Sequence, residues 1–332
     1  MMNFQPMFIR EEIVKTIRSF FYAQKFHEII TPTLNTAIPL EPNLYPFTTT
    51  WNTLKETKTL FLSQSPERSI KLLLGQGIGN SFSIGHSFRN LENSGTLHIP
   101  EFLMLEWYRE NADYKVIMKD VQSLILELKT KVDIFLKRNP SSILKYQNNK
   151  IDLSKPWNIY SLSDLFFEYA HINYEEMLAK ENTIFKIAKQ KGYQIKQSSW
   201  QELFDQLFVN EIEPKLPIDK PFFLIDFPSK ISLLCKPQNK NPLLAERFEF
   251  YIAGMELGNG NTENTDTQSI KKVFIAEEKK RQLQNIITSP IDNEFLHALD
   301  NMKSKTYAGI GVGIDRLTML LSNSANISDL QM

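Results

Sequence analysis

The sequence predicts an α+β fold in which helices pack beside antiparallel strands. Residues 82–108 and 246–260 alternate apolar and polar side chains on either side of a loop or turn, which is typical of antiparallel hairpins. Residues 9–26 and 117–138 instead place apolar side chains at helical spacing. Hairpins and amphipathic helices in one chain therefore indicate the α+β class.

Composition limits the kind of protein. The 332 residues include 38 basic and 38 acidic side chains, so the formal net charge is zero and no overall basic field indicates a nucleic-acid partner. The single cysteine, Cys235, excludes an intramolecular disulfide and suits a reducing cytoplasm; we expect it to pack as a small apolar side chain. No run approaches the ~20 apolar residues of a membrane span, and Glu11-Glu12 is unlike a signal peptide. We expect a cytoplasmic protein without membrane contact.

The first helix is predicted over residues 9–26. Ile13, Ile17 and Phe20 share one face of it, and an extended segment follows that ends at Pro32. The pattern alone predicts an amphipathic helix packed on a strand.

A second helix is predicted to begin at Ser65-Pro66-Glu67, just before apolar residues at positions 70–74. A serine or proline before a glutamate in the first turn is ordinary helix-capping chemistry, which explains this triplet without any ligand.

The hairpin at residues 82–108 gathers several polar groups. In its first strand Ser83, Gly85 and Ser87 lie on the same face as Arg89, which leaves room for a ligand beside a fixed cation. In its second strand Glu106 shares a face with a phenol, and His98 and Glu101 lie in or near the loop. The alternative is a surface hairpin whose charges are solvated.

Between the hairpins, residues 117–138 form one helical apolar stripe, which predicts core packing. Residues 139–220 are more varied, with helices expected near 161–169 and 200–209. No repeat or low-complexity linker separates this segment. We therefore expect residues 1–332 to form a single domain with an insertion at about 139–220.

The hairpin at residues 246–260 is predicted to turn at Ala253-Gly254. A two-residue loop there would place Tyr251 opposite Glu256 and Glu249 opposite Gly258. Two carboxylates held close repel each other unless a cation joins them, and Mg²⁺ bound by carboxylates and substrate phosphates meets that need. The alternative is an exposed cross-strand acidic pair.

The last motif is a glycine-rich strand, residues 308–313, that runs into a helix with Arg316 in its first turn. A cation beside free helix N–H groups can clamp a phosphate.

Taken together, these motifs resemble those of the class II aminoacyl-tRNA synthetases, and within the class the lysine branch. Motif 2 corresponds to Phe88-Arg89, His98-Ile99-Pro100-Glu101-Phe102 and Glu106-Trp107-Tyr108. Motif 1 corresponds to the first helix, its strand and Pro32, and motif 3 to the segment around Arg316. The resemblance implies the class II catalytic domain, an antiparallel sheet flanked by helices, and a homodimer formed through motif 1.

The resemblance also implies roles for individual residues. It implies that Arg89 and Arg316 are catalytic through phosphate contacts. The ATP-binding residues it implies are Arg89, Glu92, His98, Glu249, Glu256 and Arg316, with Mg²⁺ held by Glu249 and Glu256. The residues implied to bind the substrate amino acid are Glu67, Glu106, Tyr108, Gly258, Asn259 and Glu263.

The expected activity is ATP-dependent formation of a lysyl-type adenylate. Motif 1 begins near residue 9 and leaves no room for an anticodon-binding domain, so a tRNA partner is not expected. In this the chain resembles the lysyltransferases of elongation factor P, which transfer lysine or (R)-β-lysine to a lysine side chain of that factor. The preferred lysine isomer stays open. The alternatives are a stand-alone amino-acid ligase or lysyl-tRNA synthetase-like enzyme with another acceptor, and a non-catalytic regulatory paralogue.

Overall fold

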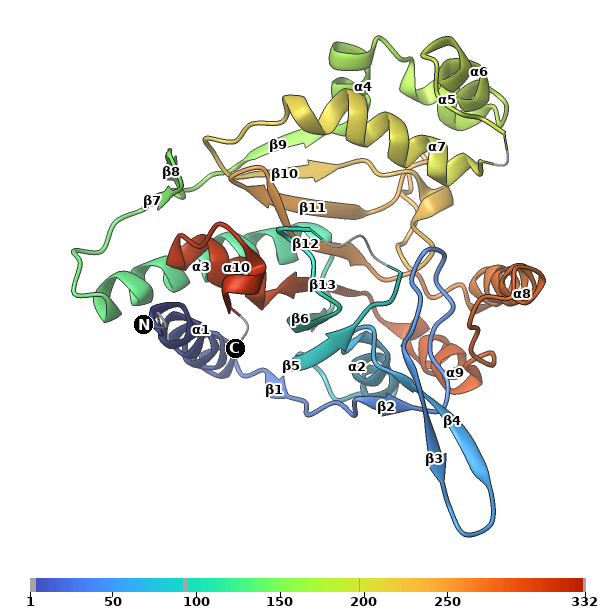
Figure 1. The fold of residues 1–332 in the computed structure, drawn as a ribbon, viewed down its shortest axis with the longest axis horizontal. Coiled ribbons are helices and arrows are strands. Elements are labelled where there is room, and N and C mark those ends of the chain that lie inside the picture. Colours follow the sequence, from blue (N-terminus) through green and yellow to red (C-terminus); the bar gives the residue numbers. More distant parts are fainter. Residues whose placement is uncertain (1–3, 92–94, 197, 331–332) are drawn as a thin grey trace.

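The centre of the molecule is a mostly antiparallel sheet with helices on both faces (Figure 1). The structure is a computed structural model that describes residues 4–91, 95–196 and 198–330. Within these residues the central sheet has eight strands, in the order β1-β5-β6-β13-β12-β11-β10-β9. In that order the strands are His27–Glu28, Ser81–Phe88, Glu101–Glu110, Tyr307–Gly313, Met255–Thr262, Arg247–Ile252, Phe222–Ile225 and Asn158–Ser161. The α+β prediction is confirmed.

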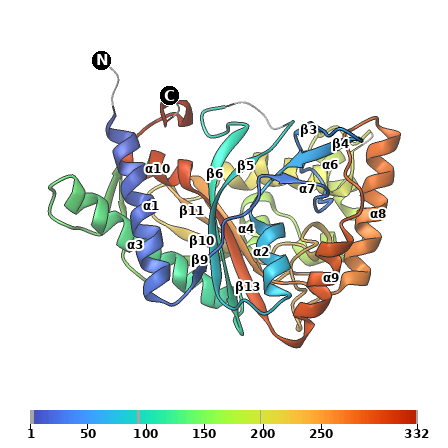
Figure 2. The ribbon, with the colours of Figure 1, turned by 90° about the horizontal axis from the view of Figure 1, so that it is seen from below.

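One face of the sheet is covered by α1, α3 and α10 (Figure 2). These helices are Gln5–Ala23, Tyr114–Phe135 and Ile314–Ser322. Their apolar stripes pack on aromatic side chains of the strands: the Phe21 ring lies 4.9 Å from that of Phe82 and 5.2 Å from that of Trp107, centroid to centroid. All three are fully buried. This layer forms part of the hydrophobic core, and the cavity described below lies on the other face of the sheet.

The opposite face carries α2, α8 and α9, which lie on the other side of the sheet in Figure 2. They are Glu67–Leu74, Thr267–Leu283 and Asn293–Asn301. Pro66 is the N-cap residue of α2 and provides no side-chain cap, but the hydroxyl of the preceding Ser65 accepts a hydrogen bond from the Glu67 N–H at 3.2 Å. Ile70 and Phe295 are buried between α2 and α9.

Most of residues 139–220 pack into a second core beside the sheet, around Phe166, Phe204 and Phe222 of β10, whereas Leu144 and Ile151 belong to the main core. The elements of this segment are β7 Ile143–Tyr146, β8 Asn149–Asp152, β9, α4 Leu162–Ala170, α5 Tyr174–Ala179, α6 Thr183–Gln190, α7 Trp200–Leu207, a π-helical turn Phe208–Ile212 and a 3-10 turn Glu213–Lys215. Both predicted helices, near 161–169 and 200–209, are present. Because β9 pairs with β10, the segment extends one edge of the central sheet.

A narrow ribbon projects from the body of the molecule (Figure 1). It is formed by β2, β4 and β3, in that order. Their bounds are Leu34–Asn35, Thr57–Leu62 and Thr48–Asn52, and the remaining short elements are the 3-10 turns Ser229–Ile231, Met302–Ser304 and Ile327–Leu330.

The hairpin of β5 and β6 has the predicted faces. Ser83 pairs with Glu106 and Gly85 pairs with Met104, so the row of small residues on β5 faces the same side as the carboxylate on β6. On the other side Phe82 and Trp107 enter the core. The alternation predicted from the sequence is confirmed, and it creates space above one face of the sheet.

The register predicted for the hairpin of β11 and β12 is partly wrong. Ala253 and Gly254 form the turn, both with positive φ (58° and 73°), as a type I′ turn requires. Tyr251 pairs with Glu256 as expected, but a β-bulge follows. Glu249 therefore pairs with Asn259, and Gly258 pairs with Phe250.

The bulge also changes the face that Gly258 occupies. A Cβ at this position would lie 2.7 Å from Cε1 of Phe250 and 2.6 Å from the Gly311 carbonyl oxygen. Gly258 is thus packed against the core side of the sheet, and the four predicted positions do not share one face. The backbone of Gly258 still borders the cavity described below.

In the described part of the chain, we find no helix that combines the length and the apolar surface that crossing a membrane requires.

Candidate active site

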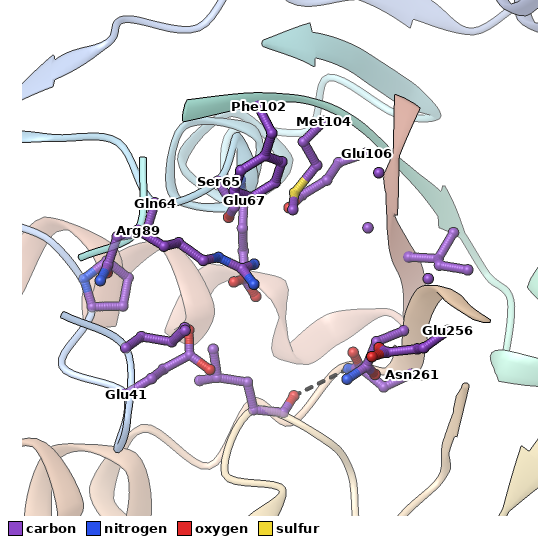
Figure 3. A pocket seen from close by; sticks show the side chains of 18 of the residues that line it. Glu41, Gln64, Ser65, Glu67, Arg89, Phe102, Met104, Glu106, Glu256 and Asn261 are labelled. Carbon is purple, nitrogen blue, oxygen red and sulfur yellow. Dashed lines mark hydrogen bonds between the residues drawn. The ribbon is translucent and has the colours of Figure 1, made fainter. Parts of the chain in front are cut away.

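A cavity of about 620 Å³ opens on the face of the sheet opposite α1 and α3 (Figure 3). Its walls come from the loop at residues 38–44, the start of α2, the hairpin of β5 and β6, and strands β12 and β13. Glycines on β13 leave space at the base of the cavity, where side chains would otherwise lie. A Cβ at Gly309, for example, would lie 2.3 Å from the Tyr108 ring. The cavity joins a cationic end to an acidic end.

The first part of the cationic end is Arg316, in the first turn of α10. Its guanidinium donates hydrogen bonds to the backbone carbonyls of Leu97 (3.2 Å) and Glu256 (2.7 Å), and its Nη2 lies 2.8 Å from His98 Nε2. The neighbouring Asp315 accepts a hydrogen bond from the N–H of Leu103 at 2.6 Å, which fixes α10 to β6. Arg316 is therefore held in place from both sides.

The second part of the cationic end is Arg89, which directly follows β5. Its backbone N–H donates to the Pro100 carbonyl at 3.0 Å, so the strand pairing continues through this residue. Its guanidinium lies over the Phe102 ring, 5.3 Å from the centroid, and reaches into the cavity (Figure 3). A planar cation held on an aromatic face is suited to bind a phosphate oxygen pair.

The acidic end contains Glu106 and Tyr108, both on β6 and both 4% exposed. The Tyr108 hydroxyl donates to Glu106 Oε2 at 3.3 Å. Burial and the nearby charge of Glu67 raise the pKa of Glu106 well above its usual value, and burial together with Glu106 does the same to the pKa of Tyr108. The charged form of a buried carboxylate with a raised pKa is stabilised by a nearby cation such as an ammonium group.

Lys71, on α2, joins two further carboxylates. Its ammonium lies 2.5 Å from Glu67 Oε1, one helical turn earlier, and 2.5 Å from Glu263 Oε2. The side chain of Lys71 is fully buried. Burial alone would lower its pKa, but the two ion pairs outweigh burial and raise it. Lys71 therefore stays charged and neutralises part of the acidic end.

Glu249 and Glu256, the residues predicted to hold magnesium, lie near enough for the charge of Glu256 to act on Glu249, although the predicted register between their strands is wrong. Glu249 is 8% exposed and accepts hydrogen bonds from Arg247 (2.7 Å) and the Tyr251 hydroxyl (2.9 Å). Burial and the charge of Glu256 raise the pKa of Glu249 to about 7. A buried carboxylate with a raised pKa beside a second carboxylate fits a site that Mg²⁺ completes together with phosphates.

The structure brings together most of the residues predicted for the site. Those that line the cavity are Glu67, Arg89, His98, Glu106, Tyr108, Glu256, Gly258, Asn259 and Arg316. Glu249 and Glu263 lie behind its wall, in contact with Arg247 and with Lys71 respectively. Glu92 lies outside the described residues.

Sequence analysis missed three charged residues of the site. The spacing in the sequence could have indicated Lys71 and Arg247, because Lys71 follows Glu67 by one helical turn and Arg247 precedes Glu249 by two strand positions. No such spacing indicates Glu41, since it lies in an irregular segment.

Asn261 also borders the cavity, and its amide donates to Glu263 at 3.3 Å. Cys235 is buried, and burial raises its pKa to about 12, so the thiol stays protonated as the apolar role predicts.

Known proteins place the chain in a family. The profile described as "tRNA synthetases class II (D, K and N)" matches residues 3–332. The protein named elongation factor P--(R)-beta-lysine ligase of Buchnera aphidicola subsp. Acyrthosiphon pisum (strain APS) is 32% identical over 99% of this chain and 94% of that protein. The lysine--tRNA ligase of Pelotomaculum thermopropionicum is 33% identical over 97% of this chain and 61% of that protein. The chain belongs to the class II tRNA synthetase family of the D, K and N type.

Proposed function

We propose that the protein activates lysine or (R)-β-lysine with ATP and transfers the aminoacyl group to a lysine side chain of elongation factor P. The observation that carries this proposal is that one cavity holds both cationic and anionic side chains. The guanidinium groups of Arg89 and Arg316 and the carboxylates of Glu67 and Glu106 all line it. An amino acid with two ammonium groups, joined through its carboxylate to a phosphate, would complement both kinds of charge.

Activation needs positioning rather than acid–base chemistry. The carboxylate of the amino acid attacks the α-phosphorus of ATP, forming a C–O–P link while pyrophosphate leaves, and no proton is transferred. Arg89 would bind the α-phosphate, and Arg316 with His98 the outer phosphates, because these cations are already fixed by their own contacts. Mg²⁺ held by Glu249 and Glu256 would neutralise charge on the phosphates.

The amino acid would lie along β6 and β12. Glu67 would receive the ammonium group next to the carboxyl, and Glu106 with the Tyr108 hydroxyl the ammonium at the far end. Asn259 borders the cavity between them. Glu263 would act through Lys71 and Asn261, since it lies behind the wall, and Gly258 would contribute its backbone only.

The acceptor is proposed from the relatives. Proteins named elongation factor P--(R)-beta-lysine ligase in two Buchnera aphidicola subspecies match along 94% and 93% of their length. Transfer joins the acceptor nitrogen to the carbonyl carbon, breaks the bond to phosphate and releases AMP and a proton. A tRNA acceptor is the second candidate, because lysine--tRNA ligases match this chain at similar identity. ATP and translation factors are cytoplasmic, so the proposed reaction takes place there.

The experiment is ATP–pyrophosphate exchange with α-lysine, with (R)-β-lysine and without amino acid, followed by transfer to elongation factor P or to tRNA. Exchange with one lysine isomer and a mass increase of elongation factor P support the proposal. Exchange with charging of tRNA alone would favour the second candidate, and no exchange with either isomer would contradict the proposal.

Glu256→Gln tests the magnesium assignment. The substitution removes a charge that is 40% exposed and keeps the side-chain shape, so we expect an unchanged Tm. Loss of a ligand that stabilises charge on the phosphates should lower the exchange rate by about 100-fold. The rate is measured over a Mg²⁺ titration, with Glu246→Gln as a control outside the cavity. An unchanged Mg²⁺ dependence would refute the assignment.

We also propose a homodimer formed through α1 and β1. Large apolar side chains are exposed on this segment: Phe8 is 52%, Tyr22 52% and Ile30 94% exposed. A continuous patch of exposed apolar side chains on α1 and on the residues that follow β1 would mark an interaction site. The two elements contact each other and lie at one edge of the molecule (Figure 1).

Ile30→Asp should raise the dissociation constant of the dimer by at least about 30-fold, because an unpaired charge would enter the interface. Sedimentation velocity over a dilution series measures this. Ile218→Asp, at a residue that is 54% exposed outside this segment, is the control and should leave the dimer intact. A wild-type monomer, or an Ile30→Asp dimer of unchanged affinity, would contradict the proposal.

A further inference from the structure

Glu41 is a carboxylate of the cavity for which the mechanism above has no role. It lies in the loop at residues 38–44 and is half-buried, and Figure 3 shows its side chain at the cavity wall. Among the residues that the structure describes, its carboxylate has no hydrogen-bond or ion-pair partner. A carboxylate placed in a cavity without a partner is suited to receive one from a ligand.

The loop that carries Glu41 is fixed at several points. Arg281, which is fully buried, donates to the backbone carbonyls of Glu41 (2.6 Å) and Leu44 (3.0 Å). Farther along, the N–H of Asn90 donates to the Tyr45 carbonyl at 2.9 Å, which ties the loop to the residue that follows Arg89. The position of Glu41 is thus set by the fold, relative to the proposed α-phosphate site.

The charges around Glu41 come from three elements. Burial and the charge of Glu67 raise the pKa of Glu41 to about 7, while Lys71, Arg89 and Arg247 act to lower it. The cation of α2 is already shared between Glu67 and Glu263. The space beside Glu41 and Glu67 therefore favours one more positive charge.

We propose that Glu41 and Glu67 together bind the substrate's ammonium group that lies next to its carboxyl. This inference rests on the proposed function and deepens it, because it assigns Glu41 to substrate recognition. The two carboxylates enter the cavity from different elements, the fixed loop and α2. An ammonium group on the second carbon and one on the third would lie at different depths between them. The pair therefore contributes to the choice between α-lysine and (R)-β-lysine.

The test compares ligands that differ by this one ammonium group. Binding of α-lysine, (R)-β-lysine and 6-aminohexanoate to the wild type and to Glu41→Gln is measured by titration calorimetry. 6-Aminohexanoate keeps the carboxyl and the distal ammonium but lacks the ammonium in question. Glu41→Gln should weaken binding of the preferred lysine by about 10–100-fold and leave binding of 6-aminohexanoate within about threefold.

A second readout is the proton released on binding. A carboxylate half-protonated near pH 7 loses its proton when a cation arrives, so the wild type should release about half a proton more than Glu41→Gln. Repeating the titrations in buffers of different ionisation enthalpy measures this difference. Glu106 and Glu263, whose pKa values are also raised, are present in both proteins.

Glu56→Gln, at an exposed residue of the projecting ribbon, is the matched control and should bind like the wild type. Glu41→Gln relieves repulsion from Glu67, so its Tm should stay equal or rise. Equal weakening of lysine and 6-aminohexanoate, or a lowered Tm, would assign Glu41 a structural role and overturn the inference alone. A wild type that binds neither lysine isomer would overturn the proposed function together with it.

Discussion

Replacing Lys71 with methionine is expected to lower the free energy of unfolding by about 3–5 kcal/mol. Methionine fills much of the same volume, so the change removes mainly the charge. Glu67 and Glu263 would then lose the ammonium group that each contacts at 2.5 Å, and Glu263 is 5% exposed. Breaking a buried ion pair by removing one partner leaves an uncompensated charge in a low-dielectric environment.

The loss of stability should depend on pH. Burial raises the pKa of Glu263 to about 7 even though Lys71 lowers it, so removal of Lys71 raises that pKa further. A carboxyl with a raised pKa takes up a proton as the pH falls, and its buried charge disappears. Lys71→Met should therefore be destabilised more at about pH 8 than at about pH 5.5.

Urea unfolding at both pH values, followed by tryptophan fluorescence, measures these differences. Lys119→Met is the control, because it makes the same substitution at an exposed position of a helix and should change stability by less than about 0.5 kcal/mol. If the two variants unfold at the same urea concentration, the ion pairs of Lys71 do not contribute to stability.

Much of the fold could be predicted because side-chain periodicity records which face of each element is buried. Phe82 and Trp107 enter the core at the alternating positions that the sequence indicates, and α3 follows the apolar stripe. The bulge beside Tyr251 could not be predicted in this way. It adds a residue to β12 between the partners of Tyr251 and Phe250, and side-chain periodicity does not indicate such an extra residue.

The site could be predicted where its residues lie on regular elements. Arg89, Glu106 and Arg316 follow from strand and helix positions, and resemblance supplied their roles. Glu41 could not be found, since its place depends on Arg281, 240 positions away in the chain. A side chain in an irregular loop is positioned by tertiary contacts, and periodicity carries no information about these.

Arg316→Lys is expected to lower the ATP–pyrophosphate exchange rate by about 100–1,000-fold while the protein stays folded. The guanidinium of Arg316 reaches two backbone carbonyls and His98 with three different nitrogens. An ammonium group is a point charge on a flexible stem and cannot keep all three directions at once. Retaining the charge while losing this geometry should therefore remove most of the catalytic effect.

The comparison that decides this is between Arg316→Lys and Arg138→Lys, which makes the same change at an exposed residue outside the cavity and should exchange like the wild type. Exchange is measured at saturating lysine over a range of ATP concentrations. If Arg316 contributes only charge, the lysine variant will keep kcat and show at most a raised KM for ATP, which would contradict the prediction. A fall in kcat would instead mean that the fixed guanidinium of Arg316 stabilises charge as it moves between the phosphates. Only an interaction that is stronger in the transition state than in the bound ground state changes kcat.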